Sequence, residues 1–225
     1  MPKTAGLSFR AALEEHYGAA FQPDYSDFPL AQRPEEAQAA ASRFAEETVS
    51  ERYDAIACIH GHFLPVKYMG LAKITNCTFV TWLRDPIARL ISHYAYWHRS
   101  YDPTSEETSS LHRKVVEEAW SLEQFCLSPQ LRNVYSRFLW QFPLDRFDFV
   151  GITEFFEEDL RYFSTRFLGH NATQEKLNMR PGPLPSALEA ALGQLDLPRI
   201  AAYHEDDVAL YSAACSARER RCGPG

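Results

Sequence analysis

The sequence has no long apolar run and no excess of positive charge. None of its apolar stretches is long enough to cross a bilayer, and its first residues form a polar motif, not the apolar core of a signal peptide. Thirty acidic residues outnumber 23 lysines and arginines, giving a net charge of −7. General binding to nucleic acid needs a broad basic surface, so that class of function is excluded. We therefore expect a cytoplasmic protein with no transmembrane segment in this chain and no nucleic-acid partner.

Cysteine is also scarce: the five residues are an odd number, widely spaced, with no CxxC pair. We expect no disulfide framework and a reducing compartment. Cys58 and Cys77 lie in apolar runs, where a thiol packs as a small buried group. Cys58, His60 and His62 alternate onto one face, a pattern that could hold a metal ion. No further ligand follows at a spacing typical of zinc sites, so we expect no metal.

Apolar runs alternate with helical patterns, which predicts an α/β fold with a parallel central sheet flanked by helices. The length suits a single domain covering residues 1–225. Strands are predicted at 54–59, 76–83 and 147–152. Helices are predicted at 8–17, 34–49 and 86–97, within 111–141 around a break at Pro129, after the last strand to 168, and at 198–217. Segments 19–33, 100–110 and 169–185 are interpreted as connections.

Three polar segments lie where strands are expected to end, which is where parallel sheets bind ligands. The first, Pro2–Ser8, is a loop of small residues that opens a helix. The free N–H groups and the positive end of the helix dipole can hold a phosphate there, and Lys3 adds a mobile charge. The loop lacks the GxxxxGK[ST] spacing of a Walker A motif. A solvated turn is the alternative interpretation.

The other two segments supply an arginine and a histidine pair. Arg84 follows a strand, and Ser92 lies two turns into the next helix, so together they can grip a second phosphate. The alternative is an arginine that binds helix-end carbonyls and a serine on a solvated face. His60 and His62 follow a predicted strand and have the side chain best matched to proton transfer near neutral pH. A purely structural histidine pair is the alternative.

Together, PKTAG opening a helix, then HGH, then RDPxxRLxSHY resemble the carbohydrate sulfotransferases related to heparan sulfate 2-O-sulfotransferase. These enzymes use 3′-phosphoadenosine-5′-phosphosulfate (PAPS). The resemblance extends to NVYSRFLW, FDFVGITEFFEEDL and, weakly, DDVALY. It implies a P-loop-like fold, PAPS as co-substrate and no metal.

The resemblance also assigns roles to residues. It implies His62 as the catalytic base, with His60 beside it in the acceptor site, and Lys3 at the transferring group. Arg84 and Ser92 would bind the 3′-phosphate. The loop at 169–183 would cover the nucleotide, with Lys176 and Arg180 as candidate contacts. The residues implied for the 5′-phosphosulfate loop are Lys3, Thr4, Ala5, Gly6, Leu7 and Ser8.

The sequence departs from the family pattern in two places. Leu7 stands where the family usually has a small hydroxyl residue, so we expect weakened binding of the phosphate. The family also places a buried strand directly before the PKT loop. We therefore expect that this chain lacks its first core strand.

The acceptor is expected to be a hydroxylated glycan or small molecule. The acidic net charge disfavours a long polyanionic glycan unless the basic residues 89, 98, 99, 113 and 114 gather into one patch. Two other functions stay open at this point. One is a non-catalytic nucleotide-binding relative. The other is a P-loop-like small-molecule kinase, which would need Mg²⁺ carboxylates that the sequence does not locate.

Overall fold

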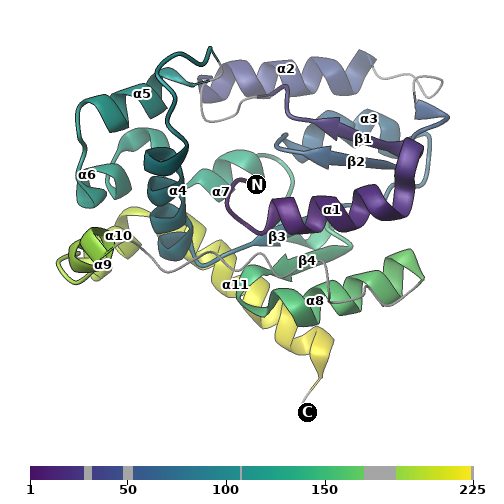
Figure 1. Ribbon diagram of the computed structural model, residues 1–225. Coiled ribbons are helices and arrows are strands. Elements are labelled where there is room, and N and C mark those ends of the chain that lie inside the picture. The colour runs from purple at the N-terminus through teal and green to yellow at the C-terminus, as the bar shows by residue number, and fades with distance from the viewer. Residues whose placement is uncertain (28–31, 48–52, 107, 170–185, 224–225) are drawn as a thin grey trace.

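A computed structural model describes residues 1–27, 32–47, 53–106, 108–169 and 186–223 (Figure 1). It confirms the α/β class. The described strands are β1 (Phe21–Asp24), β2 (Cys58–Gly61), β3 (Val80–Leu83) and β4 (Phe149–Ile152). The described α-helices are α1 (Gly6–Tyr17), α2 (Pro34–Glu47), α3 (Met69–Ala72), α4 (Pro86–Ser100), α5 (Ser110–Glu117), α6 (Leu122–Cys126), α7 (Val134–Phe138), α8 (Phe156–Phe163), α9 (Ser186–Leu192), α10 (Leu197–Tyr203) and α11 (Glu205–Cys222).

The strands form two separate parallel pairs. β1 pairs with β2, from Phe21 opposite Cys58 to Asp24 opposite Gly61. β3 pairs with β4 in the same way, from residues 80 and 149 to residues 83 and 152. Figure 1 shows all four strands running in one direction across the view. Parallel pairing was therefore predicted correctly, whereas the described residues form two pairs in place of one continuous central sheet.

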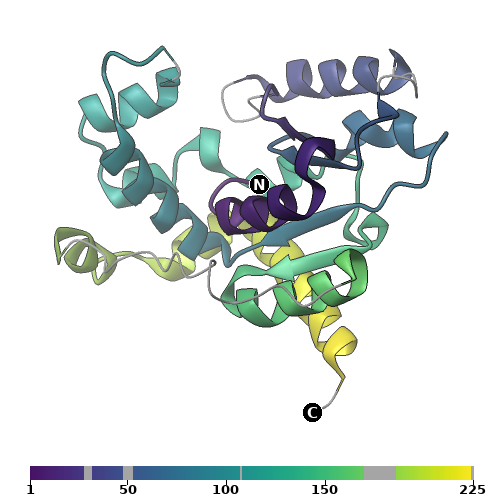
Figure 2. The same ribbon diagram turned by 45° about the vertical axis from the view of Figure 1, so that its right-hand side comes forward.

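Helix α1 links the two strand pairs. Its buried residues are Phe9 and Leu13, one turn apart on the inward face. The ring of Phe9 lies 6.1 Å from that of His60 on β2 and 5.3 Å from that of Trp82 on β3, measured between centroids. Figure 2, turned by 45°, shows α1 between β1–β2 on one side and β3–β4 on the other. The predicted stop at Gly18 is confirmed, and its φ of 52° suits glycine.

Strand β1 lies within residues 19–33, which the sequence predicts to be a connection. Pro23 within it lacks an N–H donor and is typical of edge strands, so the pattern gave no strand signal. β2 is shifted forward from the predicted 54–59, which places His60 and Gly61 inside the strand. A Cβ on Gly61 would lie 1.5 Å from the carbonyl oxygen of Asp24, so the close β1–β2 contact requires glycine there.

The predicted helix at 198–217 is two helices, because His204 interrupts it. Its φ and ψ of −109° and 31° lie outside the helical range. Nε2 of His204 lies 2.7 Å from the carbonyl oxygen of Cys126, and the N–H of Asn133 donates to Nδ1 at 3.3 Å. These buried tertiary bonds hold His204 out of the helix, a constraint that the local pattern does not carry.

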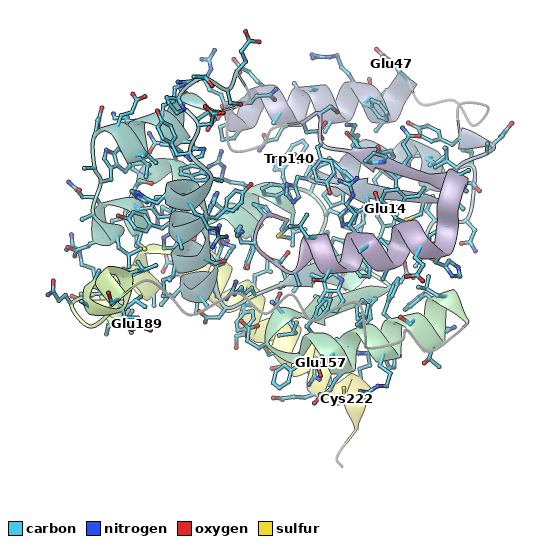
Figure 3. All side chains as sticks on the ribbon, in the orientation of Figure 1. Glu14, Glu47, Trp140, Glu157, Glu189 and Cys222 are labelled. Carbon is cyan, nitrogen blue, oxygen red and sulfur yellow. The ribbon has the colours of Figure 1, made fainter. Side chains whose placement is uncertain are left out.

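Separate apolar clusters pack around the strand pairs. One lies beneath α2, where Trp140, labelled in Figure 3, packs against Ala37, Ala41 and Phe142. Another lies between α1, β3, β4 and α8, and includes Phe9, Trp82 and Phe149. Within the described ranges, no helix combines the length and apolar character needed to span a membrane.

Candidate functional site

The loop before α1 has a strained backbone. Lys3 and Ala5 have φ values of 65° and 60°, in the left-handed region that residues with a Cβ seldom occupy. The buried hydroxyl of Thr4 donates to the carbonyl oxygen of Met1 at 3.0 Å and closes the turn between them. Strain of this kind persists only where the surroundings enforce it, and it is common at ligand sites.

The first turn of α1 has free backbone donors. Ala5, the N-cap residue, makes no side-chain cap bond, so the N–H groups of Gly6, Leu7 and Ser8 keep no capping acceptor. A Cβ on Gly6 would meet no atom within 4 Å, so there is open space beside this residue. The side chain of Leu7 is 70% exposed. The helix start can therefore receive an anion through its backbone, as the sequence predicts.

The turn that carries Arg84 connects β3 to α4. Asp85 caps α4 by accepting the N–H of Ala88 at 2.8 Å, and Pro86 is the first helical residue, which confirms the prediction for this boundary. The hydroxyl of Tyr135 accepts the N–H of Arg84 at 3.1 Å and donates to its carbonyl oxygen at 2.7 Å. One buried side chain therefore fixes both backbone groups of Arg84.

Two further side chains hold the same turn from the end of β4. The hydroxyl of Thr153 donates to the carbonyl oxygen of Leu83 at 2.9 Å. The N–H of Asp85 donates to a carboxylate oxygen of Glu154 at 3.0 Å. Sequence reasoning missed these roles, and that of Tyr135. These residues lie in the NVYSRFLW and FDFVGITEFFEEDL segments, which are part of the resemblance but to which it assigns no role.

Arg84 and the loop before α1 lie together. Nη1 of Arg84 donates to the carbonyl oxygen of Lys3 at 3.5 Å. Nζ of Lys3 lies 3.9 Å from the centroid of the Tyr96 ring on α4. Burial, followed by the nearby charges of Arg99 and Arg84, lowers the pKa of Lys3 to about 8. The structure thus gathers several cations at this loop, which is an arrangement suited to anionic groups.

The two histidines face the same region from β2 and the residue after it. The hydroxyl of Tyr25 lies 3.0 Å from Nδ1 of His60, and its ring lies 5.1 Å from that of His62. Burial, then the positive amino terminus, lowers the pKa of His60 to about 4 and that of His62 to about 3. Both imidazoles are therefore neutral at pH 7 and can accept a proton, but at these pKa values they are weak bases; a bound anion nearby would raise the pKa values toward the neutral range that proton transfer requires.

A cavity of about 740 Å³ brings the loop and the histidines together: Thr4, Gly6, His60 and His62 all line it. Lys3 and Arg84 are not among its lining residues; the bond from Arg84 ends on the carbonyl oxygen of Lys3, the neighbour of Thr4 in the chain. Ser92 is half-buried on α4, and no hydrogen bond joins its hydroxyl to another side chain or carbonyl among the described residues. Loop 169–183, with Lys176 and Arg180, falls outside the described residues except for Gly169.

Cys58, His60 and His62 are the residues that the sequence offers for a metal ion. Burial raises the pKa of the Cys58 thiol to about 12, so this thiol is protonated at neutral pH. In the part of the chain that the structure describes, no three His, Cys, Asp or Glu side chains gather where they could hold a metal ion.

The basic residues considered for a polyanionic acceptor do not form one patch. Arg89 is fully buried in α4, and its guanidinium nitrogens bond to no described residue. Arg113 donates to the carbonyl oxygens of Pro103 and Ser105, both at 2.7 Å. Lys114 lies over the ring of Trp120 instead. The structure therefore gives no support to a long polyanionic glycan as acceptor.

No protein-family model, no curated protein and no solved structure matches this chain.

The low pKa of His62 predicts how stability depends on pH. Between pH 6.5 and about 3 the unfolded chain binds a proton at this position that the folded chain excludes, so stability falls as the pH falls through this window. In His62→Gln, the free energy of unfolding should fall less steeply below pH 6.5, by about 1 kcal/mol for each pH unit. Urea unfolding at pH 7, 6 and 5 measures this. Gln194→Ala, an exposed substitution that removes no titrating group, should leave the dependence unchanged. If the free energy of unfolding changes with pH by the same slope in the natural chain and in His62→Gln, His62 is not a buried neutral imidazole.

Proposed function

We propose that this chain transfers a sulfuryl group from PAPS to a hydroxyl acceptor. The observation that carries the proposal is the meeting of three features at one place. The uncapped start of α1 and the Arg84 turn are joined by the Arg84–Lys3 bond, and neutral His62 lines the same cavity as the helix start. Two anion-binding elements beside a proton acceptor suit a co-substrate with two anionic ends and a hydroxyl nucleophile.

The two ends of the co-substrate have separate sites in this proposal. The N–H groups of Gly6, Leu7 and Ser8 receive the 5′-phosphosulfate, with Lys3 beside them. Arg84, held by Tyr135, and the hydroxyl of Ser92 receive the 3′-phosphate. A bound anion would favour the protonated form of Lys3 and raise its pKa from about 8.

The reaction needs one proton acceptor and one site for negative charge. His62 takes the proton of the acceptor hydroxyl as the oxygen forms its bond to sulfur. The bond between sulfur and the bridging oxygen breaks, and its electron pair stays on the departing 5′-phosphate. Lys3 and the helix-start amides stabilise that charge. Tyr25, at 3.0 Å from His60, orients the second histidine beside the acceptor.

We further propose a neutral acceptor, a carbohydrate or a small hydroxylated molecule. Arg89 is buried and Arg113 is bonded to loop carbonyls, so neither can bind a polyanionic chain along the surface.

The second candidate function is a nucleotide-binding protein without transfer activity. The division of the strands into two pairs favours this second function. His62 follows β2 and Arg84 follows β3, so the proposed base and the proposed phosphate site belong to different strand pairs, whereas a general base must be held within hydrogen-bond reach of its substrate.

The assignment of Arg84 predicts selective loss of one phosphate contact. Arg84→Ala should weaken binding of adenosine 3′,5′-bisphosphate about 10- to 100-fold, because a charge-assisted guanidinium contact is lost. Binding of AMP, which has no 3′-phosphate, should change much less. Isothermal titration of both ligands measures this, with Arg113→Ala as an arginine control outside the site. Equal losses for the two ligands would remove Arg84 from the 3′-phosphate site.

The assignment of His62 predicts a loss confined to the chemical step. His62→Ala should lower kcat about 10²- to 10⁴-fold, the usual effect of removing a general base. Affinity for adenosine 3′,5′-bisphosphate should stay near that of the natural chain. His60→Ala should act mainly on the KM of the acceptor, and His98→Ala, exposed on α4, serves as control. A melting curve for each variant separates misfolding from lost chemistry. A folded, fully active His62→Ala would exclude His62 as the base.

A further inference from the structure

The end of strand β1 is anchored beside the two histidines. The buried carboxylate of Asp24 accepts hydrogen bonds from Nζ of Lys67 at 2.7 Å and from the hydroxyl of Tyr68 at 2.6 Å. The carbonyl oxygen of Asp24 accepts the N–H of His62 at 3.1 Å, which fastens the residue after β2 to the same place. Tyr25 directly follows Asp24, so the pairing of β1 with β2 holds its backbone beside the histidines.

Tyr25 contacts the two histidines in different ways. Its hydroxyl lies 3.0 Å from Nδ1 of His60, within hydrogen-bond distance, whereas it meets His62 only ring to ring, with 5.1 Å between the centroids. The other ring nitrogen of His60, Nε2, has no hydrogen bond to a described residue, and His60 lines the cavity. One nitrogen of His60 is therefore used by the fold, and the other is left for a ligand.

The direction of the Tyr25–His60 bond follows from Arg10. A hydrogen bond to Glu14, followed by one to Tyr25, raises the pKa of Arg10, and its guanidinium carbon lies 5.6 Å from the centroid of the Tyr25 ring. Arginine has donors only, so the Tyr25 oxygen accepts from Arg10 and its own O–H is left to donate. Among the described residues, Nδ1 of His60 is the acceptor for this O–H. In a neutral imidazole, a ring nitrogen that accepts leaves the hydrogen on the other nitrogen, here Nε2.

The ring of His62 has no such partner. In the described part of the chain, no hydrogen bond joins this ring to another group, and His62 lines the same cavity as His60. A neutral imidazole always has one nitrogen without a hydrogen. Because nothing in the described fold occupies that nitrogen, His62 can present it to a ligand.

We propose that Tyr25 fixes His60 as the tautomer with its hydrogen on Nε2, so that the histidine pair offers the cavity one hydrogen-bond donor, at His60, and one proton acceptor, at His62. Tyr25 is then a positioning residue that acts through His60, and Arg10 supports it by occupying the Tyr25 oxygen. The symmetrical sequence HGH thereby provides two different groups.

This division of roles matches an alcohol as the acceptor, a consequence that rests on the proposed sulfuryl transfer. A hydroxyl oxygen has two lone pairs. One forms the bond to sulfur while the other accepts the hydrogen bond from Nε2 of His60, and the hydroxyl proton goes to His62. The electron pair of the breaking sulfur–oxygen bond leaves with the 5′-phosphate. Two acceptors or two donors at the same place could not serve both sides of the hydroxyl group.

The position of the hydrogen is measured by NMR of the chain with ¹⁵N-labelled histidine, at pH 7 and with neither nucleotide nor acceptor present. Two-bond correlations between ring hydrogens and ring nitrogens identify which nitrogen is protonated. His204 is the internal reference. Its Nε2 lies 2.7 Å from the carbonyl oxygen of Cys126, which can only accept, so Nε2 of His204 is protonated. The signals that disappear in His60→Gln identify the ring of His60.

In the natural chain, the Nε2–H tautomer of His60 should exceed the Nδ1–H tautomer about tenfold, the ratio that one hydrogen bond supports. Nδ1 should have the chemical shift of a hydrogen-bonded nitrogen. Tyr25→Phe keeps the ring and removes the hydroxyl, so the excess should fall severalfold and the Nδ1 shift should become that of a nitrogen without a hydrogen bond. Tyr162→Phe, at an exposed tyrosine on α8, should change neither.

Two results would overturn the proposal. A natural chain with the Nδ1–H tautomer in excess would make His60 a second acceptor. An unchanged tautomer ratio and Nδ1 shift in Tyr25→Phe, with the His204 signals in place, would show that Tyr25 does not fix the ring. If Tyr25→Phe does not fold, the natural chain decides alone: protonated Nε2 with hydrogen-bonded Nδ1 supports the proposal, and any other pattern contradicts it. A chain with the proposed tautomers but without transfer activity would contradict the sulfuryl transfer alone.

Discussion

The hydroxyl of Tyr135 bonds the N–H and the carbonyl oxygen of Arg84, and the geometry of the candidate site depends on this contact. Arg84 lies between β3 and α4, so without Tyr135 its N–H and its carbonyl oxygen would lose these two hydrogen bonds. Thr153 and Glu154 add bonds from the end of β4 to the residues on either side. The turn then holds the loop before α1 through the bond from Arg84 to Lys3.

Basic groups dominate the electrostatics of the site. Burial and neighbouring positive charges lower the pKa values of Lys3, His60 and His62. Strongly shifted pKa values that gather at one place are more typical of a ligand site than of a structural one. The left-handed backbone of Lys3 and Ala5 adds local strain at the same place.

The sequence predicted those parts of the fold whose signals are local. Asp85 and Pro86 fix the start of α4, and Gly18 fixes the end of α1, because caps act within one turn. β1, the break at His204 and the division of the strands were not predictable in this way. Each depends on contacts between residues distant in the sequence, such as His204 with Cys126.

In the candidate site too, the residues that belong to short motifs were predicted, and those that act through distant contacts were not. His60, His62, Thr4 and Gly6 were predicted from short motifs, and the structure places them on one cavity. Tyr135, Thr153 and Glu154 act on a turn 51 to 70 residues away, which no local pattern reveals. Their positions come from the packing of α7 and β4 against β3.

We propose that the start of α1 and the Arg84 turn form one site for a nucleotide with phosphates on both its 3′ and 5′ positions. Calorimetric titration of the natural chain with adenosine 3′,5′-bisphosphate, ATP and AMP measures whether they do. The bisphosphate should bind at least about tenfold more tightly than AMP or ATP, since only the bisphosphate has a 3′-phosphate for Arg84 and Ser92. Equal affinity for the three nucleotides, or binding of ATP alone in a Mg²⁺-dependent manner, would contradict it.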